Sequence, residues 1–358
     1  MSQPFTLQMV ASKALGGAEH WLLRFSIGLA QRKAPIAVAI RAGSALDGLD
    51  PAGIPTHRLP FRTTWDPLSR LAVSRLIRRL EPDIVQTYMG RATRLTRIPR
   101  QRGPIHIARL GGYYALGPYR HAHAWIGNTK ALCDWMVQQG LPAARVYQIY
   151  NFAPAPHPIG ERPLAARRAE HGIPDDAWVL VALGRLVPVK GHAHLIAALD
   201  RLPNEVEGRP LRLVIVGDGP LAAALQDQAR QHGQDGRIIW TGWQPEPAPY
   251  LQMADLVVFP SLDAETLGNV ILEAWSWQRP LVTTSFRGAR ELARHGEDAW
   301  CVPCADPDAL AEGIRIALSD ATLRAALAAR GHVRVTQEFS RDVILDQYQA
   351  LYHQLASR

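Results

Sequence analysis

The segment spanning residues 255–278 constrains the fold more than any other part of the sequence. Leu256–Phe259 is a short, wholly apolar run, which is typical of a strand buried on both faces of a parallel sheet. Polar residues 260–265 predict a loop, and apolar residues at helical spacing predict a helix that begins at Thr266. This order brings free backbone N–H groups and the positive end of a helix dipole to one place. The segment therefore predicts an anion-binding site in a parallel α/β fold.

Two carboxylates, Glu265 and Glu273, lie on either side of the expected helix start. On one continuous helix they would be roughly 12 Å apart along the axis and about 80° apart around it, so they would not share a face. We therefore predict that Glu265 lies in the loop and Glu273 about two turns inside the helix. In this arrangement they would contact different parts of one ligand.

This Glu-x7-Glu pattern after a buried strand resembles the signature of retaining, nucleotide-sugar-dependent glycosyltransferases of family 4, which have the GT-B fold. The resemblance implies that Glu265 contacts the donor sugar and that Glu273 binds the ribose hydroxyls. It also implies that backbone amides hold the donor phosphate, here those of Thr266, Leu267, Gly268 and Asn269. The family usually has glycine at the first and an aromatic residue at the second of these four positions, so sugar choice is expected to differ. A capped helix with two surface glutamates is the alternative.

A second motif follows the apolar run that begins at Trp178. Arg185 and Lys190 come after this run, at the carboxyl end of an expected parallel strand, where open α/β sheets bind ligands. A guanidinium can bind a diphosphate with two hydrogen bonds, and an ammonium adds a point charge. Together they would stabilise a leaving nucleoside diphosphate. The motif resembles the Gly-Arg-x4-Lys-Gly of family 4, with two ordinary surface cations as the alternative.

Two further stretches are candidates for the donor site. Gly16 and Gly17 precede a helix expected from Ala18, and glycines there let the backbone approach a phosphate. The stretch matches the Gly-Gly-Ala-Glu turn that the family places against the donor diphosphate, although a plain turn is the commoner explanation. Trp243 follows an expected strand where relatives contact the base, and a surface-packed tryptophan explains it equally well.

Gly217 and Gly219 formally satisfy a dinucleotide-binding fingerprint. That function requires an acidic residue about twenty positions on, at the end of the next strand. The next expected strand, residues 237–241, runs into Gly242 and Trp243 without one. The sequence therefore disfavours a dehydrogenase.

The acceptor site is predicted from a turn in the first half of the chain. Its candidate residues are Arg109, Gly111, Gly112 and Tyr113. Many family members carry His-Gly at this turn, and this chain lacks that histidine. We assign no role to the nearby histidines, His106, His121 and His123.

With 358 residues the chain suits two domains, each of which can bury its own core. The proline-rich residues 153–160 mark the boundary between them. We predict an acceptor-binding domain at 1–155, a nucleotide-sugar-binding domain at 156–335, and a C-terminal helix at 336–358 that packs back on the first domain. The expected class is α/β, with the GT-B fold of two Rossmann-like, doubly wound parallel-sheet domains that face each other across a cleft.

Charge is distributed unevenly along the chain. Residues 1–160 hold 20 Lys and Arg against 7 Asp and Glu, a net of +13, and the remainder has a net of −5. This asymmetry indicates an anionic partner for the first half. No nucleic-acid motif or aromatic platform accompanies the charge, which disfavours nucleic acid. A phosphorylated acceptor or an anionic membrane surface fits better, with an ordinary solvated basic face as the alternative.

Three cysteines cannot form a disulfide framework, and Cys301 and Cys304 lack the partners of a metal site. Asp306 and Asp308 are explained by a helix N-cap followed by Pro307. We therefore expect no metal and no cofactor beyond the co-substrate. No apolar run reaches the ~20 residues of a membrane span and no signal peptide is evident, so we expect a cytoplasmic protein, peripheral at the inner membrane face.

The resemblance to family 4 thus implies a hexosyltransferase that uses a UDP or GDP sugar and acts with retention, and we expect it to be metal-independent. The expected acceptor is a bacterial glycolipid such as lipopolysaccharide core. Three alternatives stay open: a glycoside hydrolase that uses the two glutamates, a nucleotide-sugar epimerase, and a non-enzymatic sugar- or lipid-binding protein.

Overall fold

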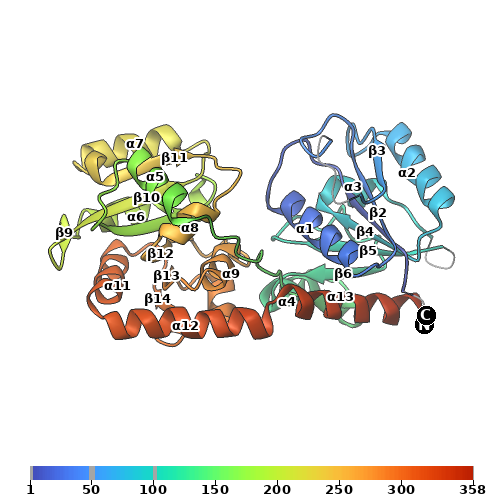
Figure 1. Ribbon diagram of the computed structural model, residues 1–358. Helices are drawn as coiled ribbons and strands as arrows, with labels where there is room; N and C mark the ends of the chain where they lie inside the picture. The colour runs from blue at the N-terminus through green and yellow to red at the C-terminus, as the bar shows by residue number, and fades with distance from the viewer. Residues whose placement is uncertain (1–2, 48–52, 100–102, 358) are drawn as a thin grey trace. The chain divides into compact units, whose positions relative to one another are not determined.

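A computed structural model describes residues 3–47, 53–99 and 103–357 (Figure 1). The chain divides into two compact units. The first comprises Met1–Asn151 together with Arg341–Arg358, and the second comprises Phe152–Ser340. No helix among the described residues is both long enough and apolar enough to cross a membrane.

The first unit is built on an all-parallel sheet with the strand order β3-β2-β1-β4-β5-β6-β7. Its strands are β1 (Thr6–Val10), β2 (Ile36–Arg41), β3 (Thr56–Leu59), β4 (Ile84–Tyr88), β5 (Ile105–Leu110), β6 (Ala124–Gly127) and β7 (Val146–Gln148). The central strands β1 and β4 are buried along their whole length, although each contains polar residues such as Gln8 and Gln86. Strand β3 lies at the edge of the sheet, and only its last residue is buried.

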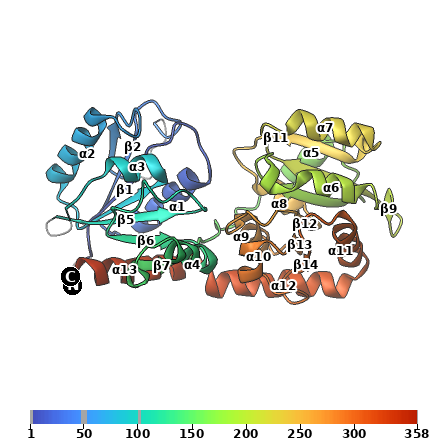
Figure 2. The same cartoon turned by 180° about the vertical axis from the view of Figure 1, so that it is seen from behind.

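Helices cover both faces of this sheet, as Figures 1 and 2 show from opposite sides. They are α1 (Gly17–Gln31), α2 (Pro67–Leu80), α3 (Met89–Leu95), α4 (Lys130–Gln138), the 3-10 turn η1 (Ala143–Arg145) and α13 (Arg341–Ala356). Helix α13 buries the ring of Tyr348, whose centroid lies 4.5 Å from that of Phe25 on α1. Arg32 adds ion pairs with Asp342 and Asp346. The last helix is therefore an integral part of the first unit.

The second unit contains a sheet with the order β11-β10-β8-β12-β13-β14, and β9 pairs with β10 in antiparallel fashion. The strands are β8 (Trp178–Leu183), β9 (Glu205–Val206), β10 (Arg209–Val216), β11 (Ile238–Gly242), β12 (Leu256–Phe259), β13 (Leu281–Thr284) and β14 (Trp300–Val302). The helices and 3-10 turns are α5 (Glu161–Glu170), η2 (Pro188–Lys190), α6 (His192–Leu199), α7 (Ala222–Gln231), η3 (Asp235–Arg237), α8 (Ala248–Met253), α9 (Asn269–Ser276), α10 (Arg287–Leu292), α11 (Pro307–Ser319) and α12 (Ala321–Glu338).

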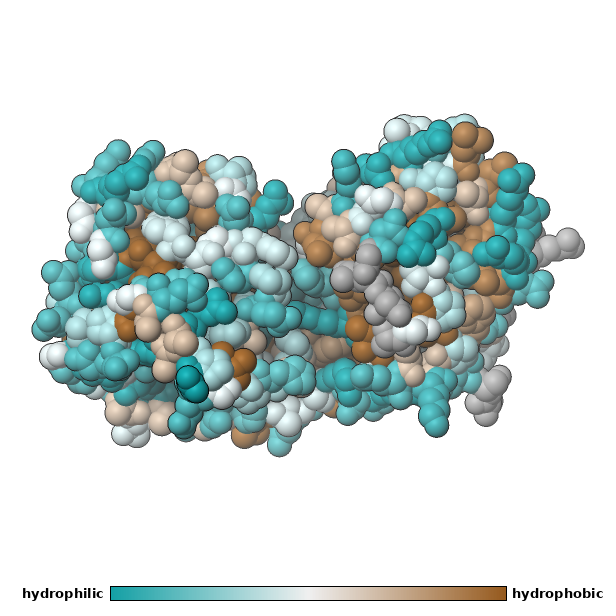
Figure 3. All heavy atoms as spheres, turned by 45° about the horizontal axis from the view of Figure 1, so that its top comes forward, coloured by the Kyte–Doolittle hydropathy of each residue, from teal (hydrophilic) through white to brown (hydrophobic). Residues whose placement is uncertain are grey.

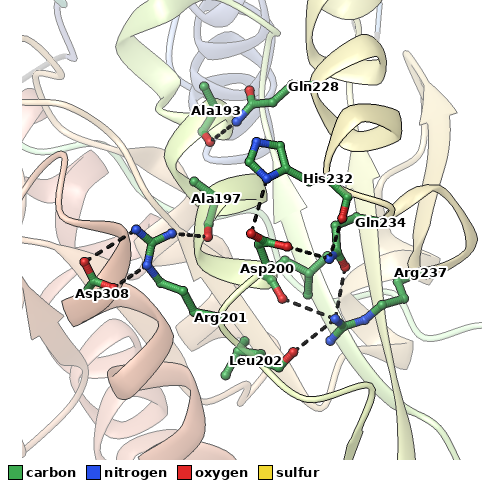
Figure 4. A network of polar contacts seen from close by, with 11 residues as sticks. Ala193, Ala197, Asp200, Arg201, Leu202, Gln228, His232, Gln234, Arg237 and Asp308 are labelled. Carbon is green, nitrogen blue, oxygen red and sulfur yellow. Dashed lines mark hydrogen bonds and ion pairs between the residues drawn. The ribbon is translucent and has the colours of Figure 1, made fainter.

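A polar network fixes the C-terminal end of α6 against its neighbours (Figure 4). The Asp200 carboxylate lies 3.2 Å from His232 Nδ1 and accepts a 3.1 Å hydrogen bond from Gln234 Nε2. The buried Arg237 donates to the carbonyl oxygen of Leu202 and to Gln234 Oε1. The network therefore ties the C-terminal end of α6 to η3 and the loop before it.

In each unit the first strand lies in the middle of the sheet, and the chain then runs outward first to one side and then to the other. This is the doubly wound Rossmann-like order, and it confirms the predicted α/β class with two parallel sheets. The order reverses between β1 and β4 in the first unit and between β8 and β12 in the second. Ligands of such sheets bind beyond the carboxyl ends of the strands at this reversal.

Candidate active site

In the second unit the reversal point lies between β8 and β12, which pair directly through Leu256–Leu180 and Val257–Val181. Beyond the strands, the loop after β8 contains Arg185 and Lys190, and the loop after β12 contains Glu265. Three of the residues predicted from sequence therefore lie in loops beyond the carboxyl ends of β8 and β12, where an α/β fold binds its ligand.

The two loops are in close contact, and glycine makes this contact possible. Gly191 has φ +67°, and a Cβ on it would lie 1.9 Å from the carbonyl oxygen of Pro260. The Leu262 N–H donates a 2.8 Å hydrogen bond to the carbonyl oxygen of Val189. Any other residue at position 191 would separate the loops, so the glycine of the Arg-x4-Lys-Gly motif sets the geometry of the site.

The structure brings Lys190 and Glu265 together as an ion pair. Lys190 Nζ lies 2.7 Å from Glu265 Oε2, and the two side chains are only 20% and 15% exposed. The ammonium also lies 5.1 Å from the centre of the Phe259 ring. The ion pair thus fixes both side chains beyond the carboxyl ends of β8 and β12.

Arg185 is positioned differently. Its side chain is exposed, and among the described residues its guanidinium has no ion-pair or hydrogen-bond partner. Trp243, after β11, is also exposed, with 58% of its surface accessible. These two side chains are therefore free to contact a ligand at the same edge of the sheet.

The loop between β12 and α9 differs from the sequence expectation. The helix begins at Asn269, three residues after Thr266, because Gly268 adopts φ +74° and acts as the N-cap. Thr266 and Leu267 are buried in the loop, where a Cβ on Gly288 would lie 2.0 Å from the Thr266 carbonyl oxygen. The positive end of the α9 dipole points into the site from Gly268 onward.

Glu273 consequently lies about one turn inside α9 rather than two, and its side chain is partly buried. Glu265 lies in the loop as predicted. The two glutamates belong to different elements, as expected from their spacing.

Asp263 holds this loop against α10, and sequence reasoning missed it. Its carboxylate accepts hydrogen bonds of 3.0 Å from Arg287 and 2.8 Å from Arg290. Burial alone would raise the pKa of Asp263, but the hydrogen bonds and charges of Arg290 and Arg287 outweigh it and lower the pKa. The only signal in the sequence is the pair of arginines three positions apart on α10, opposite a loop carboxylate.

His192 is a second residue that sequence reasoning missed. It opens α6 next to Lys190, is 3% exposed, and has no hydrogen-bond partner for either ring nitrogen among the described residues. Burial, assisted by the charge of Lys190, lowers the pKa of His192 to about 4. The ring is therefore neutral near pH 7 and adds no charge to the site.

In the first unit, Gly16 and Gly17 lie at the predicted strand-to-helix turn. Gly16 is the N-cap of α1, and Gly17 is its first residue and is exposed. The first turn also carries Glu19, which is buried, and a Cβ on Gly16 would lie 3.1 Å from Glu19 Oε2. The turn has the form expected of a phosphate-binding backbone, and its role stays a prediction.

Arg109 is buried and bonds to other residues of the first unit. It is 4% exposed, its Nε donates a 3.0 Å hydrogen bond to the Tyr348 hydroxyl, and its Nη2 donates to Asn151 Oδ1. The guanidinium also lies 4.6 Å from the centre of the Trp21 ring. Arg109 thus ties β5 to α13, and its acceptor-binding role stays a prediction.

The turn after Arg109 contains an exposed Gly111 and a buried Gly112. The Tyr113 ring packs edge-on against Trp135 with centroids 5.4 Å apart. The acceptor-binding role of Gly111, Gly112 and Tyr113 stays a prediction.

Asp306 and Cys301, which were considered for metal binding, have other structural environments. Among the described residues no group of three or more His, Cys, Asp and Glu side chains could hold a metal ion. Asp306 caps α11 and accepts a 2.9 Å hydrogen bond from the Ala309 N–H, as the N-cap interpretation predicts. Burial, together with Asp298, raises the pKa of Cys301 to about 12, which keeps this thiol protonated.

Comparison with known proteins assigns the chain to a family. Residues 165–334 match the family model "Glycosyl transferases group 1". The lipopolysaccharide core biosynthesis glycosyltransferase LpsE of Rhizobium meliloti is 32% identical over 93% of this chain and 94% of its own. LpsD of the same organism is 31% identical over 94% of this chain and 95% of its own.

Solved structures share the fold. A glycosyltransferase from Rickettsia africae superposes with a TM-score of 0.84 at 16% identity, covering 99% of both chains. Anabaena HepE in complex with UDP and glucose superposes with a TM-score of 0.83 at 21% identity, covering 98% of this chain and all of its own. The chain has the GT-B fold of these neighbours and belongs to the group 1 glycosyltransferases.

Proposed function

We propose that this glycosyltransferase moves a hexose from a UDP or GDP sugar to a bacterial glycolipid of the lipopolysaccharide core, with retention and without a metal or further cofactor. The observation that carries the proposal is the Lys190–Glu265 ion pair between the loops that follow β8 and β12. Arg185 lies in the same loop as Lys190, and its side chain has no ion-pair partner among the described residues. Two cations in one loop and a helix N-terminus after the neighbouring strand suit a diphosphate.

The ion pair suggests how the donor would be received. Lys190 Nζ is shared with a carboxylate at 2.7 Å, and a donor diphosphate would replace that carboxylate as its partner. Glu265 would then be free to accept hydrogen bonds from hydroxyls of the transferred sugar. Arg185 would bind the diphosphate from the exposed side, and both cations would stabilise the charge on the leaving nucleoside diphosphate.

The remaining contacts with the donor are proposed from the family 4 motifs described above. Glu273 would bind the ribose hydroxyls, and the exposed Trp243 would pack on the base. The family resemblance also assigns the backbone amides of Gly16 and Gly17 to the donor diphosphate. Further amide contacts would come from the stretch of Thr266, Leu267, Gly268 and Asn269.

Relatives support the choice of donor and acceptor. Anabaena HepE has been solved with UDP-glucose, and WaaG is described as a glycosyltransferase involved in lipopolysaccharide biosynthesis. LpsE and LpsD are named for the lipopolysaccharide core. The acceptor would bind at the turn that contains Arg109, Gly111, Gly112 and Tyr113. We propose that the protein works in the cytoplasm at the inner membrane face.

A transfer assay with Arg185→Ala tests the proposal. The wild-type enzyme should transfer sugar from one member of a UDP- and GDP-sugar panel to truncated lipopolysaccharide core, and kcat/KM should fall roughly 100- to 1,000-fold in the variant. Arg212→Ala, which removes the partly buried Arg212 side chain from β10, is the control. Proton NMR of the product reports the anomeric configuration. Full activity of Arg185→Ala, or donor hydrolysis without transfer in the wild type, would contradict the proposal.

A further inference from the structure

Three large apolar side chains are exposed within seven successive residues of the first unit. Trp65 is 71% exposed, Leu68 57% and Leu71 41%. Only four other large apolar side chains among the described residues are exposed, and they are scattered: Met89, Tyr114, Trp243 and Val333. An exposed apolar cluster of this kind indicates an interaction site.

The geometry of α2 explains why these side chains face outward. Its buried residues, Ser69, Val73, Leu76 and Ile77, form a stripe at helical spacing that packs toward the sheet. Leu68, Leu71, Arg75 and Arg78 recur at intervals of three and four residues on the opposite side of the helix. The outer face of α2 therefore combines apolar residues in its first turns with arginines in its later turns.

Further arginines surround the apolar cluster. The Arg94 guanidinium of α3 stacks on the Trp65 ring at 3.4 Å from its centre. Burial and the nearby charges of Arg70 and Arg94 lower the pKa of Arg97, which shows that these three cations are neighbours. We call this set the α2 surface, and it comprises Arg62, Trp65, Leu68, Arg70, Leu71, Arg75, Arg78, Arg94 and Arg97. Figure 3 shows apolar and hydrophilic residues side by side on the first unit.

Five arginines of the α2 surface are exposed, and within the part of the chain that the structure describes none of their side chains forms an ion pair or a hydrogen bond: Arg62, Arg70, Arg75, Arg78 and Arg97. The carboxylate of Asp66 caps α2 by accepting from the N–H groups of Leu68 and Ser69. The hydrogen bonds from Ser69 and Leu68, and to a smaller extent the charge of Arg62, lower the pKa of Asp66. In the second unit, by contrast, exposed arginines such as Arg230 and Arg315 pair with a carboxylate on their own helix.

We propose that the α2 surface docks on an anionic lipid bilayer, with its arginines on lipid phosphates and Trp65, Leu68 and Leu71 inserted at the boundary between headgroups and acyl chains. Tryptophan prefers this boundary, and a helix with apolar and basic residues on one face binds it. Unpaired arginines are attracted to the negative surface potential of the bilayer. The inference rests on the proposed function, because the glycolipid acceptor is anchored in such a bilayer.

Other partners fit the α2 surface less well. A second copy of the chain would bring like charges face to face in a two-fold interface. Nucleic acid would satisfy the charges, but the single tryptophan is already stacked on Arg94, and leucines offer no platform for bases. A bilayer satisfies both the charges and the apolar side chains.

Vesicle flotation of the full chain tests the inference. We expect flotation with phosphatidylcholine vesicles that contain about one-third phosphatidylglycerol, and little with phosphatidylcholine alone. Binding should weaken between about 0.1 M and about 0.5 M NaCl, because salt screens the arginine contribution. Equal flotation on both vesicles, or none on either, would overturn the inference.

Two sets of variants place the binding on the α2 surface. Changing Arg70, Arg75 and Arg78 to glutamine should weaken binding to the anionic vesicles on the order of 100-fold. Glutamine at Arg162, Arg230 and Arg315 removes the same charge from the second unit and should change binding by less than about threefold. Equal loss in both triple variants would show a general charge effect and overturn the inference.

The apolar part is tested by changing Trp65, Leu68 and Leu71 to serine, with Val333→Ser as the exposed apolar control. The triple variant should lose most flotation at high salt, and the control should keep it. Unchanged melting temperatures would confirm that both variants are folded. Size-exclusion chromatography shows whether the α2 surface instead joins two copies: a wild-type dimer that the triple variant dissociates would contradict bilayer docking.

The test also separates this inference from the proposed function. The α2 surface variants should transfer sugar to a delipidated, soluble core oligosaccharide at the wild-type rate and lose rate only on acceptor in vesicles. Loss on both acceptors would show that the variants damage the enzyme and would remove the case for a separate docking surface. A wild-type chain that floats but transfers no sugar would leave docking intact and contradict the function.

Discussion

The ion pair between Lys190 and Glu265 fixes the positions of both side chains in the candidate active site. Their charged atoms lie 2.7 Å apart, and both side chains are largely shielded from solvent. The same distance separates Lys130 Nζ from Asp134 on the surface of α4, where the side chains are 73% and 55% exposed. The exposed pair contributes little to stability, whereas the shielded pair fixes two groups at the ends of β8 and β12.

Lys190→Ala should therefore impair donor binding and catalysis. We expect kcat/KM for the nucleotide sugar to fall roughly 100- to 1,000-fold, because the variant would remove the charge that we propose stabilises the leaving diphosphate. Lys130→Ala is the matched control and should stay within about twofold of wild type. Steady-state kinetics with the donor varied checks both. Equal activity of the two variants would mean that Lys190 does not contact the diphosphate.

Residues at strand ends could be predicted from the sequence, and residues that support them could not. Arg185, Lys190 and Glu265 follow apolar runs, so their place at one edge of a parallel sheet follows from the fold class. Asp263 was missed because its partners lie on α10, and nothing local connects a loop carboxylate to that helix. The predicted acceptor-binding role of Arg109 stays a prediction, and its hydrogen bond to Tyr348 on the last helix could not be read from the local sequence.

At the scale of elements, the loop conformation before α9 decides where the helix begins. The apolar spacing predicts a start at Thr266, but Gly268 takes φ +74° and delays the start to Asn269. A periodic pattern shows which residues face the core and does not show a left-handed backbone. The edge strand β3 was missed for a related reason, since an edge strand needs no apolar run.

Gly268→Ala should destabilise the protein by about 2–4 kcal/mol, because a Cβ would lie 2.6 Å from Phe286 and 2.7 Å from Phe259 in a left-handed backbone. Gly296 offers the matched control: its φ is +75°, but a Cβ there would meet no atom within 4 Å. Gly296→Ala should cost only about 1 kcal/mol. Urea denaturation measures both, and equal costs would show that the crowding at α9 is unimportant.

The buried histidine of β5 should make stability depend on pH. His106 is fully buried, with Nε2 3.0 Å from Thr87 Oγ1. Burial, with smaller contributions from the charges of His121, His123 and Arg97, lowers the pKa of His106 well below its usual value of 6.5. Below about pH 6.5 the unfolded chain therefore binds a proton that the folded chain excludes, and stability falls as the pH falls.

The free energy of unfolding should accordingly decrease between pH 7 and pH 5, with a slope of up to about 1.4 kcal/mol per pH unit from this histidine. The slope should be shallower in His106→Gln than in His157→Gln, which alters an exposed histidine of the proline-rich residues 153–160. Denaturation series at several pH values measure the slopes. Identical slopes for wild type and His106→Gln would contradict the assigned cause.

At the scale of the whole molecule, two Rossmann-like units divide the chain, and each reverses its strand order beside a glycine-containing loop. The α/β class with two parallel sheets was predictable from the sequence, but the edge strand β3 was not. Among the described residues, exposed arginines of the α2 surface form no ion pair, whereas many arginines of the second unit pair with carboxylates. Under the two proposals above, the first unit would contact lipid and the second would bind the nucleotide.

Isothermal titration with nucleosides, nucleoside monophosphates and nucleoside diphosphates tests the central claim, a diphosphate bound beyond β8 and β12. We predict that UDP or GDP binds, that the corresponding nucleoside binds at least about 100-fold more weakly, and that Arg185→Ala and Lys190→Ala each remove most of this difference. If no diphosphate binds the wild-type chain, or if both variants bind it as the wild type does, the claim is wrong.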